Sequence, residues 1–280
     1  TVFEASPLNR VLEQGAPGAT WQPAVSRSTT SGRTVVQGYA VNNSTDEVKL
    51  WMVTANGASS SGNYAAGKLY KNTTHDENWD GGSTVEGMVE TFTDLEGRVI
   101  LKRIWKTASE KLNTYYIYDD LDNLSYVVPP AVTTNSFTES DTAFDQFIYA
   151  YHYDGRKRVN EKKIPGKGWE YLVYNTLDQV VLTQDAVQRG NNQWYFTKYD
   201  ALGRNILSGP LSSSTSRSVW QGLIDAQSTP YLWEERDNAN AGDTNTGYTN
   251  RSLPTSGISI YYTINYFDDY NYVDWGSVNA

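Results

Sequence analysis

Large apolar side chains alternate with small or polar ones over several short stretches of the chain. The alternation is clearest at 148–153 and 194–199, and short apolar runs occur at 99–101, 124–128 and 180–182. A two-residue period is typical of β-strands with one buried face. The pattern therefore predicts a chain rich in short strands.

A six-residue motif lies between these stretches. It starts with an aromatic residue, has Asp or Asn second and a polar residue sixth, and occurs at 118–123, 153–158, 174–179 and 199–204; Thr replaces the aromatic residue at 93–98. Successive copies start 25, 35, 21 and 25 residues apart, and a fainter copy lies at 5–10. The longer interval contains 129–142, a Pro-, Thr- and Ser-containing segment interpreted as a loop. Spacing of this kind predicts a repeat architecture.

The motif has the chemistry of a hairpin turn. Asp200 is placed to accept backbone N–H groups, and Gly203 is placed where a positive φ follows a type I turn; Asp94 and Gly97 repeat the arrangement. Two copies depart from it, because Asp replaces Gly at 122 and 178, while Asn and Gln replace Arg at 123 and 179. Asp tolerates the left-handed region, so these turns are expected to be less regular but still formed.

Each unit of 21 to 25 residues accommodates two strands and two turns, which is one hairpin. The predicted fold is all-β, with stacked antiparallel β-hairpins forming a curved ribbon or partial shell. Equivalent tyrosines would lie in a row, with the motif arginines available to stack or pair with them. The residues assigned to this structural repeat are Asp94, Gly97, Arg98, Tyr118, Asp119, Tyr153, Asp154, Arg158, Tyr174, Tyr199, Asp200, Gly203 and Arg204.

Outside the repeats the pattern is less regular. One short helix is predicted at 216–227, with Val219, Trp220, Leu223 and Ile224 on one face and serines 212–214 as caps. The other predicted elements are strand-like alternation at 35–51, a small-residue loop at 57–67, a polar loop at 238–250, and strands at 258–262 and 264–267. The resulting regions are an amino-terminal β region (1–92), the hairpin ribbon (93–210), a helix and loop insertion (211–257) and returning strands (258–280).

Composition narrows the possible functions. The formal charge is −9, which argues against a nucleic-acid partner. The chain has no Cys and two His, so thiol chemistry is excluded and imidazole chemistry is restricted to His75 and His152. No apolar run approaches the roughly 20 residues of a transmembrane helix, so no membrane insertion is predicted.

The motif resembles that of the RHS or YD-repeat proteins, whose Tyr-Asp-x-x-Gly-Arg unit is matched in full at 199–204. The direct resemblance covers 93–209, and 6–18, 47–51 and 266–270 resemble the amino-terminal region of long RHS proteins of gram-negative bacteria. The resemblance implies a β-ribbon wound into a shell around a carboxy-terminal toxin or variable domain. The family's self-cleaving core has no match here, and the chain is interpreted as a segment of a larger protein.

The strongest candidate for a metal site is a possible calcium loop. Asp76, Asn78 and Asp80 provide oxygen ligands at alternate positions before Gly81, as in the first half of an EF-hand loop. Gly87 occupies the twelfth position, where the closing carboxylate belongs, so an ordinary polar turn is the favoured interpretation and calcium the alternative.

Enzymatic alternatives have weaker support. His75 or His152 would be the general base of a hydrolase, but no Gly-x-Ser-x-Gly elbow is present. The pairs at 119–120 and 268–269 suggest glycoside hydrolysis, although adjacent carboxylates point to opposite faces of a strand and more often serve turns. The expected catalytic set is therefore empty.

Aromatic residues outside the motif leave a binding function open. Trp79, Trp105, Trp233 and Trp275 lie outside the regular turn positions and would suit a sugar-binding surface. The leading hypothesis is a non-enzymatic RHS-type shell segment, secreted or displayed at a bacterial surface. Its expected partners are the remainder of its own polypeptide and a secretion apparatus. The alternatives are a cell-surface adhesin or carbohydrate-binding module, or a cargo bound to the secretion apparatus.

Overall fold

The structure is a computed structural model that describes residues 1–229, 231–237 and 246–268. The chain divides into two compact units, Thr1–Ala150 and Tyr151–Ala280, which are described separately. The division falls inside the range 93–210 that the sequence assigns to one ribbon. The predicted all-β fold with antiparallel hairpins is confirmed, and the sheet is open rather than closed into a barrel.

The first unit contains an antiparallel sheet in the order β1-β2-β3-β6-β7-β8-β9-β10-β12. Its strands are β1 (Val2–Phe3), β2 (Val11–Gln14), β3 (Val35–Val41), β6 (Tyr70–His75), β7 (Val89–Thr93), β8 (Val99–Trp105), β9 (Lys111–Tyr118), β10 (Leu124–Val128) and β12 (Tyr149–Tyr153). Two short 3-10 helices, η1 (Ala19–Trp21) and η2 (Ser44–Asp46), lie in its loops. Most neighbours in the order are also neighbours in sequence, as expected for stacked hairpins.

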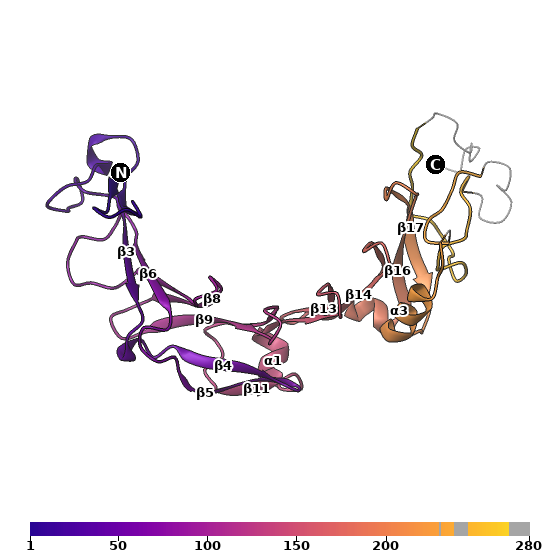
Figure 1. Ribbon diagram of the computed structural model, residues 1–280, viewed down its shortest axis with the longest axis horizontal. Coiled ribbons are helices and arrows are strands. Elements are labelled where there is room, and N and C mark those ends of the chain that lie inside the picture. Colours follow the sequence, from indigo (N-terminus) through magenta and orange to yellow (C-terminus); the bar gives the residue numbers. More distant parts are fainter. Residues whose placement is uncertain (230, 238–245, 269–280) are drawn as a thin grey trace. The chain divides into compact units, whose positions relative to one another are not determined.

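A second, three-stranded sheet in this unit has the order β11-β5-β4 and comprises β4 (Lys49–Thr54), β5 (Gly57–Asn63) and β11 (Ser136–Thr138). It lies beside β9 together with helix α1 (Thr142–Phe147), as Figure 1 shows. Phe137 packs edge-on against Tyr126, with ring centroids 5.2 Å apart, and also contacts Phe144 and Trp51. This aromatic cluster joins the two sheets because it removes large rings from water.

The second unit continues with hairpins in the order β13-β14-β15-β16-β17-β18. These strands are β13 (Val159–Ile164), β14 (Gly168–Tyr174), β15 (Val180–Gln184), β16 (Gln193–Tyr199), β17 (Asn205–Ser212) and β18 (Thr263–Ile264). Helix α2 (Ala186–Gly190) connects β15 to β16, and α3 (Arg217–Asp225) packs against β14 (Figure 1). The core includes Trp194, Phe196, Ile206 and Leu207, which are almost completely buried.

The predicted helix at 216–227 forms as α3, with differences in detail. Trp220 and Ile224 are buried, whereas Val219 and Leu223 are exposed, so the predicted four-residue face was wrong in half of its members. Val219 with Leu223, and Trp220 with Ile224, are each four residues apart, so each pair shares one side of the helix, and the contact with β14 selects the pair that is buried. The N-cap is Ser216 rather than one of the serines at 212–214.

Three loop and strand predictions need correction. The small-residue segment 57–67 contains β5, because it is held between β4 and β11 by backbone pairing that small side chains do not oppose. The predicted loop 129–142 contains β11. Only Thr263–Ile264 is a strand within 258–267, and Ile258 forms an isolated bridge with Leu211. Residues 238–245 and 269–280, with Asp269 and Trp275, lie outside the described residues. None of the described helices is long and apolar enough to cross a membrane.

Candidate functional site

The turns of the repeat share one hydrogen-bonding pattern, seen in full at Asp200. Asp200 N–H donates to the Arg204 carbonyl at 3.0 Å, and Gly203 N–H donates back to the Asp200 carbonyl at 3.0 Å. Asp200 Oδ1 accepts the N–H groups of Leu202 and Arg204, at 3.0 and 2.9 Å. Arg204 Nε donates to Oδ2 at 2.6 Å. The Asp200 carboxylate therefore accepts hydrogen bonds from two backbone N–H groups of the turn and from the arginine that ends it.

The other copies form the same turn. In each of them the N–H of the second motif residue donates to the carbonyl of the sixth: Asp94 to Arg98, Asp119 to Asn123, Asp154 to Arg158 and Asn175 to Gln179. The fifth position of the motif has a positive φ in each of these five copies: 84° at Gly97, 67° at Asp122, 62° at Lys157, 63° at Asp178 and 79° at Gly203. The left-handed positions predicted for Asp122 and Asp178 are confirmed, and these turns keep the full bonding pattern rather than a less regular one.

In three copies of the motif, a tyrosine hydroxyl connects the turn to the strand after the preceding turn. Tyr118 Oη donates to the Val99 carbonyl at 3.2 Å, Tyr174 Oη to the Val159 carbonyl at 2.8 Å, and Tyr199 Oη to the Val180 carbonyl at 2.8 Å. The acceptor is in each case the first residue of a strand. Burial raises the pKa of the Tyr199 hydroxyl, so it stays a donor at neutral pH. The sequence predicted the tyrosine positions but not this bond.

The amino-terminal copy at 5–10 contains a related turn. Glu4 replaces the motif aspartate and accepts Arg10 Nε at 2.9 Å, while Asn9 takes the positive φ of 50°. Hydrogen bonds from Arg10 and Ser6 lower the pKa of Glu4 to about 2. Arg10 lies 4.2 Å from the ring centroid of Tyr39, whose hydroxyl donates to the Val11 carbonyl at 3.0 Å. The contacts that join successive turns of the motif therefore also occur at 4–39, where the sequence matches the motif only faintly.

The motif arginines also reach the next turn. Arg98 and Arg158 lie over the rings of Tyr118 and Tyr174, 5.1 and 4.5 Å from the centroids. Arg204 lies over Phe267 instead, at 4.4 Å. The stacking predicted for Arg158 is confirmed, and Arg204 uses a phenylalanine that sequence reasoning did not connect to the motif.

Each of these arginines also pairs with an aspartate of positive φ, which lies in the next turn of the motif for Arg98 and Arg158 and is Asp268 for Arg204. Arg158 Nη1 lies 2.7 Å from Asp178 Oδ1, and Arg204 Nη1 lies 2.8 Å from Asp268 Oδ1. Arg98 forms the corresponding ion pair with Asp122. Copies of the motif with Arg in the sixth position therefore alternate with copies that have Asp in the fifth position and a neutral residue in the sixth. Asp122 and Asp178, which depart from the Tyr-Asp-x-x-Gly-Arg motif, are therefore the ion-pair partners of the motif arginines in the preceding Arg-containing copies.

The second unit contains a buried ion pair outside the repeat. Lys198 and Glu234 are each 1% exposed, and Lys198 Nζ donates to Glu234 Oε1 at 2.8 Å, to Asn250 Oδ1 at 2.6 Å and to the Ser252 carbonyl at 2.9 Å. Burial lowers the pKa of Lys198 and opposes ionisation of Glu234, but Lys198 and backbone donors bring the pKa of Glu234 below its usual range. Since each charge has several partners, the pair fastens Glu234 and residues 250–252 to β16.

A similar network fastens the loop 42–47 in the first unit. Arg103 Nη1 lies 3.2 Å from Glu90 Oε2, and Arg103 Nη2 donates to the Asp46 carbonyl at 2.6 Å. Lys71 Nζ lies between Asp46 Oδ1 and Glu90 Oε1, at 2.6 and 2.7 Å. These charges are paired within the fold and leave no group free for catalysis in this cluster.

The residues of the predicted calcium loop contact other protein groups. Asp76 Oδ1 accepts the Asn78 N–H at 2.9 Å, and Asp80 Oδ1 accepts the Gly82 N–H at 2.9 Å. Asn78 Oδ1 accepts a hydrogen bond from Arg33. Within the part of the chain that the structure describes, no group of three or more His, Asp or Glu side chains is arranged to hold a metal ion. The calcium site stays a prediction.

The two histidines lie in different settings. His75 stacks on Trp79 with centroids 4.1 Å apart, and burial together with the Arg27 charge lowers its pKa. His152 Nδ1 lies 2.8 Å from Glu161 Oε2 and its ring stacks on Trp169. Each imidazole ring therefore stacks on a tryptophan, and that of His152 also contacts a carboxylate.

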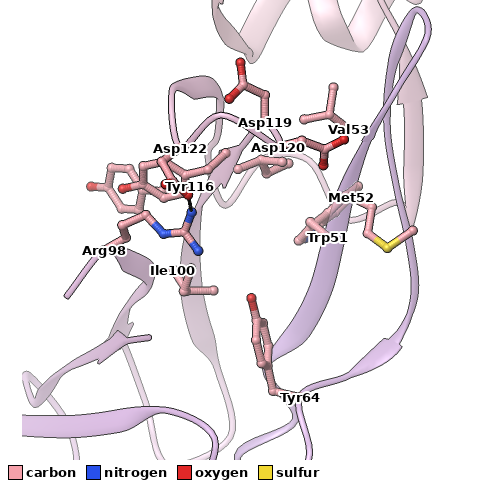
Figure 2. A pocket seen from close by; sticks show the side chains of 12 residues that line it. Trp51, Met52, Val53, Tyr64, Arg98, Ile100, Tyr116, Asp119, Asp120 and Asp122 are labelled. Atoms are coloured by element: carbon pink, nitrogen blue, oxygen red, sulfur yellow. Dashed lines mark hydrogen bonds and ion pairs between the residues drawn. The ribbon is translucent and has the colours of Figure 1, made fainter. Parts of the chain in front are cut away.

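A pocket of about 480 Å³ lies in the first unit between β4 and the turn that follows β9 (Figure 2). Its lining residues are Trp51, Met52, Val53, Tyr64, Arg98, Ile100, Tyr116, Ile117, Tyr118, Asp119, Asp120 and Asp122. Figure 2 shows the three aspartates at one end and Tyr64 at the other, with its hydroxyl directed into the pocket. Burial, and then the charge of Asp94, raises the pKa of Tyr64. Sequence reasoning did not bring these residues together.

The fold and the turns define a class of protein, an open antiparallel sheet of stacked hairpins coupled turn to turn. Among known families, residues 1–35 match one described as "Domain of unknown function (DUF6443)". That segment contains the Glu4–Arg10 turn but ends before the repeats at 93–204. No curated protein matches the chain.

Proposed function

We propose that the chain is a non-enzymatic structural segment of a secreted RHS-type β-shell, which encloses or carries a carboxy-terminal toxin or variable domain. The observation that supports this function most directly is the coupling of successive turns. Tyrosine hydroxyls join successive hairpins at Tyr174 and Tyr199, and the ion pair of Arg158 with Asp178 joins two turns of the motif. A shell wall needs such lateral contacts because each hairpin alone is only marginally stable.

The charged clusters support a structural function as well. Lys198 with Glu234, and Arg103 with Glu90, hold long loops against the sheet and are internally satisfied. A carbohydrate-binding function would need an open aromatic platform. Trp79, one of the tryptophans predicted for such a surface, stacks on His75 at 4.1 Å and has Arg27 over its ring at 5.2 Å. Lys111 lies 4.8 Å over the ring of Trp105, another of them. The structural shell segment therefore remains the better supported proposal, with the remainder of the polypeptide and a secretion apparatus as its partners.

Limited proteolysis of the full-length gene product tests the proposal. Trypsin should leave the hairpin region and an enclosed carboxy-terminal segment intact under native conditions. The double variant Arg158→Ala/Arg204→Ala, which removes two turn-to-turn ion pairs, should expose that segment to cleavage. The matched control Lys106→Ala removes an exposed ion pair with Glu110 that joins no turns of the motif. If the carboxy-terminal segment is cleaved as fast in the wild type as in isolation, the shell function is refuted.

A further inference from the structure

Strand β4 has an open edge. In the order β11-β5-β4 it pairs with β5 on one side, and no strand among the described residues pairs with its other side. Hydrogen-bonded and non-hydrogen-bonded pairs alternate along an antiparallel ladder, so every second residue of β4 directs its N–H and C=O away from β5. These main-chain groups are available to an added strand.

The second half of this edge, from Met52 to Thr54, lacks the protection that edge strands usually have, whereas the first half has the charged Lys49, whose N–H donates to Tyr115 Oη at 3.4 Å, and an irregular register with β5 between Lys49 and Trp51. Charged side chains, Pro or bulges normally discourage strand addition. Between Lys49 and Thr54, β4 contains Leu50, Trp51, Met52 and Val53, and both Met52 and Val53 are exposed. An exposed apolar edge strand indicates that another chain segment covers it.

The pocket beside this edge is acidic at one end. Asp119, Asp120 and Asp122 face a single cation, Arg98, which is already paired with Asp122 and, at 2.7 Å, with Asp94. Asp119 accepts hydrogen bonds within its own turn. The exposed Asp120 carboxylate has no partner among the described residues, so the pocket has a net negative charge that a cation would neutralise.

The rest of the pocket suits a long basic side chain. Val53 and Ile100 offer apolar surface for an aliphatic stem, and the rings of Tyr64 and Tyr116 can lie against a cation. The Tyr64 hydroxyl has no hydrogen-bond partner among the described residues and is directed into the pocket (Figure 2). The volume of about 480 Å³ lies in the range of roughly 300–1,000 Å³ typical of ligand sites.

We propose that β4 accepts an extended polypeptide segment as an additional strand, with a Lys or Arg side chain of that segment in the pocket beside Asp120. Main-chain hydrogen bonds to the edge supply affinity, and the acidic pocket selects a basic residue. The site uses none of the contacts between motif turns other than Arg98 with Asp122. Its failure would leave the proposed shell function standing.

Binding of a dye-labelled peptide, Thr-Val-Lys-Val-Thr, to the 280-residue chain tests the proposal by fluorescence anisotropy at low and high salt. Binding should weaken with salt, and Asp120→Asn should weaken it by about fivefold, as for loss of an exposed ion pair. Asp120→Lys should abolish it, because two cations would then meet. Glu86→Gln is the matched control, since Glu86 is exposed and lies outside the pocket, and it should bind like the wild type.

Changes in the peptide give a second test that needs no variant protein. Replacing its Lys by Glu should remove binding, and so should N-methylation of alternate backbone amides, which blocks pairing with an edge strand. Equal binding of the Glu peptide would overturn the basic pocket, and equal binding of the N-methylated peptide would overturn strand addition. Displacement of the peptide by a chito-oligosaccharide, or absence of any binding by the Lys peptide, would also overturn the proposal.

Discussion

Arg158 Nη1 lies 2.7 Å from Asp178 Oδ1, so the cation at the end of one turn meets the anion in the left-handed position of the next. Arg98 with Asp122 and Arg204 with Asp268 repeat this relationship. The pairs make the structural period two turns rather than one. Within a pair, the first turn supplies Arg and the second supplies Asp in place of Gly.

Substitutions at Asp178 should separate its two functions. Asp178→Asn keeps a residue that tolerates a φ of 63° and loses the ion pair with Arg158, so it should lower the free energy of unfolding by about 0.5 kcal/mol. Asp178→Ala also removes the short polar side chain whose local hydrogen bonding makes the left-handed region tolerable, at a further cost of about 1–2 kcal/mol. Urea denaturation measures both. Equal losses would show that φ at this position does not matter.

Removal of one tyrosine hydroxyl should weaken the coupling between hairpins. Tyr199→Phe loses the 2.8 Å bond to the Val180 carbonyl and should lower the free energy of unfolding by about 1 kcal/mol. Tyr262→Phe is the control, because Tyr262 is exposed and should tolerate the change within about 0.5 kcal/mol. An effect at Tyr262 as large as that at Tyr199 would contradict the assignment of a coupling bond.

The buried pair in the second unit should be costly to break. Lys198→Met leaves Glu234 charged and buried without its main partner and should destabilise the unit by about 3–5 kcal/mol. Adding Glu234→Leu should cost less than the sum of the two single changes, because the residues share one interaction. Thermal unfolding of the four species completes the cycle. Strict additivity would mean that the two side chains do not act as a pair.

Acid stability should depend on Glu161. His152 and Arg217 lower its pKa from the ordinary value of 4.5, against the effect of burial. Because the folded-state pKa is depressed, its contribution to stability is present above pH 4.5 and is lost as the pH falls through the folded-state value. Glu161→Gln should therefore lower stability at pH 7 and flatten its decline below pH 4.5. Glu86→Gln should leave the acid profile unchanged, and a profile unchanged by Glu161→Gln would contradict the prediction.

The turns could be predicted from sequence because their chemistry is local. An acceptor at Asp94, Asp154 or Asp200 and a residue that tolerates positive φ three positions later lie within five residues of each other. At 154–158 the spacing points to Lys157, which adopts a φ of 62° although its side chain does not favour the left-handed region. The partners of the motif arginines were only partly predictable. When each copy is compared with the motif alone, Asp122 and Asp178 appear only as replacements of the motif glycine, with no sign that they form ion pairs.

The remaining features depend on contacts between distant residues. Strand β5 has a sequence of small and polar residues, and its pairing with β4 and β11 decides its conformation. Glu234 gives no local signal that it meets Lys198, and Asp120 gives none that it lies at a pocket beside β4. Such sites require the register of the sheet, which the repeat spacing alone does not supply.

An electron cryo-microscopy map of the full-length gene product tests the central claim most directly. The account predicts that the turns at 94–98, 119–123, 154–158, 175–179 and 200–204 follow one another along one edge of a continuous ribbon, with further polypeptide enclosed by it. A map in which these turns lie on separate sandwiches around a shared cleft would contradict the account.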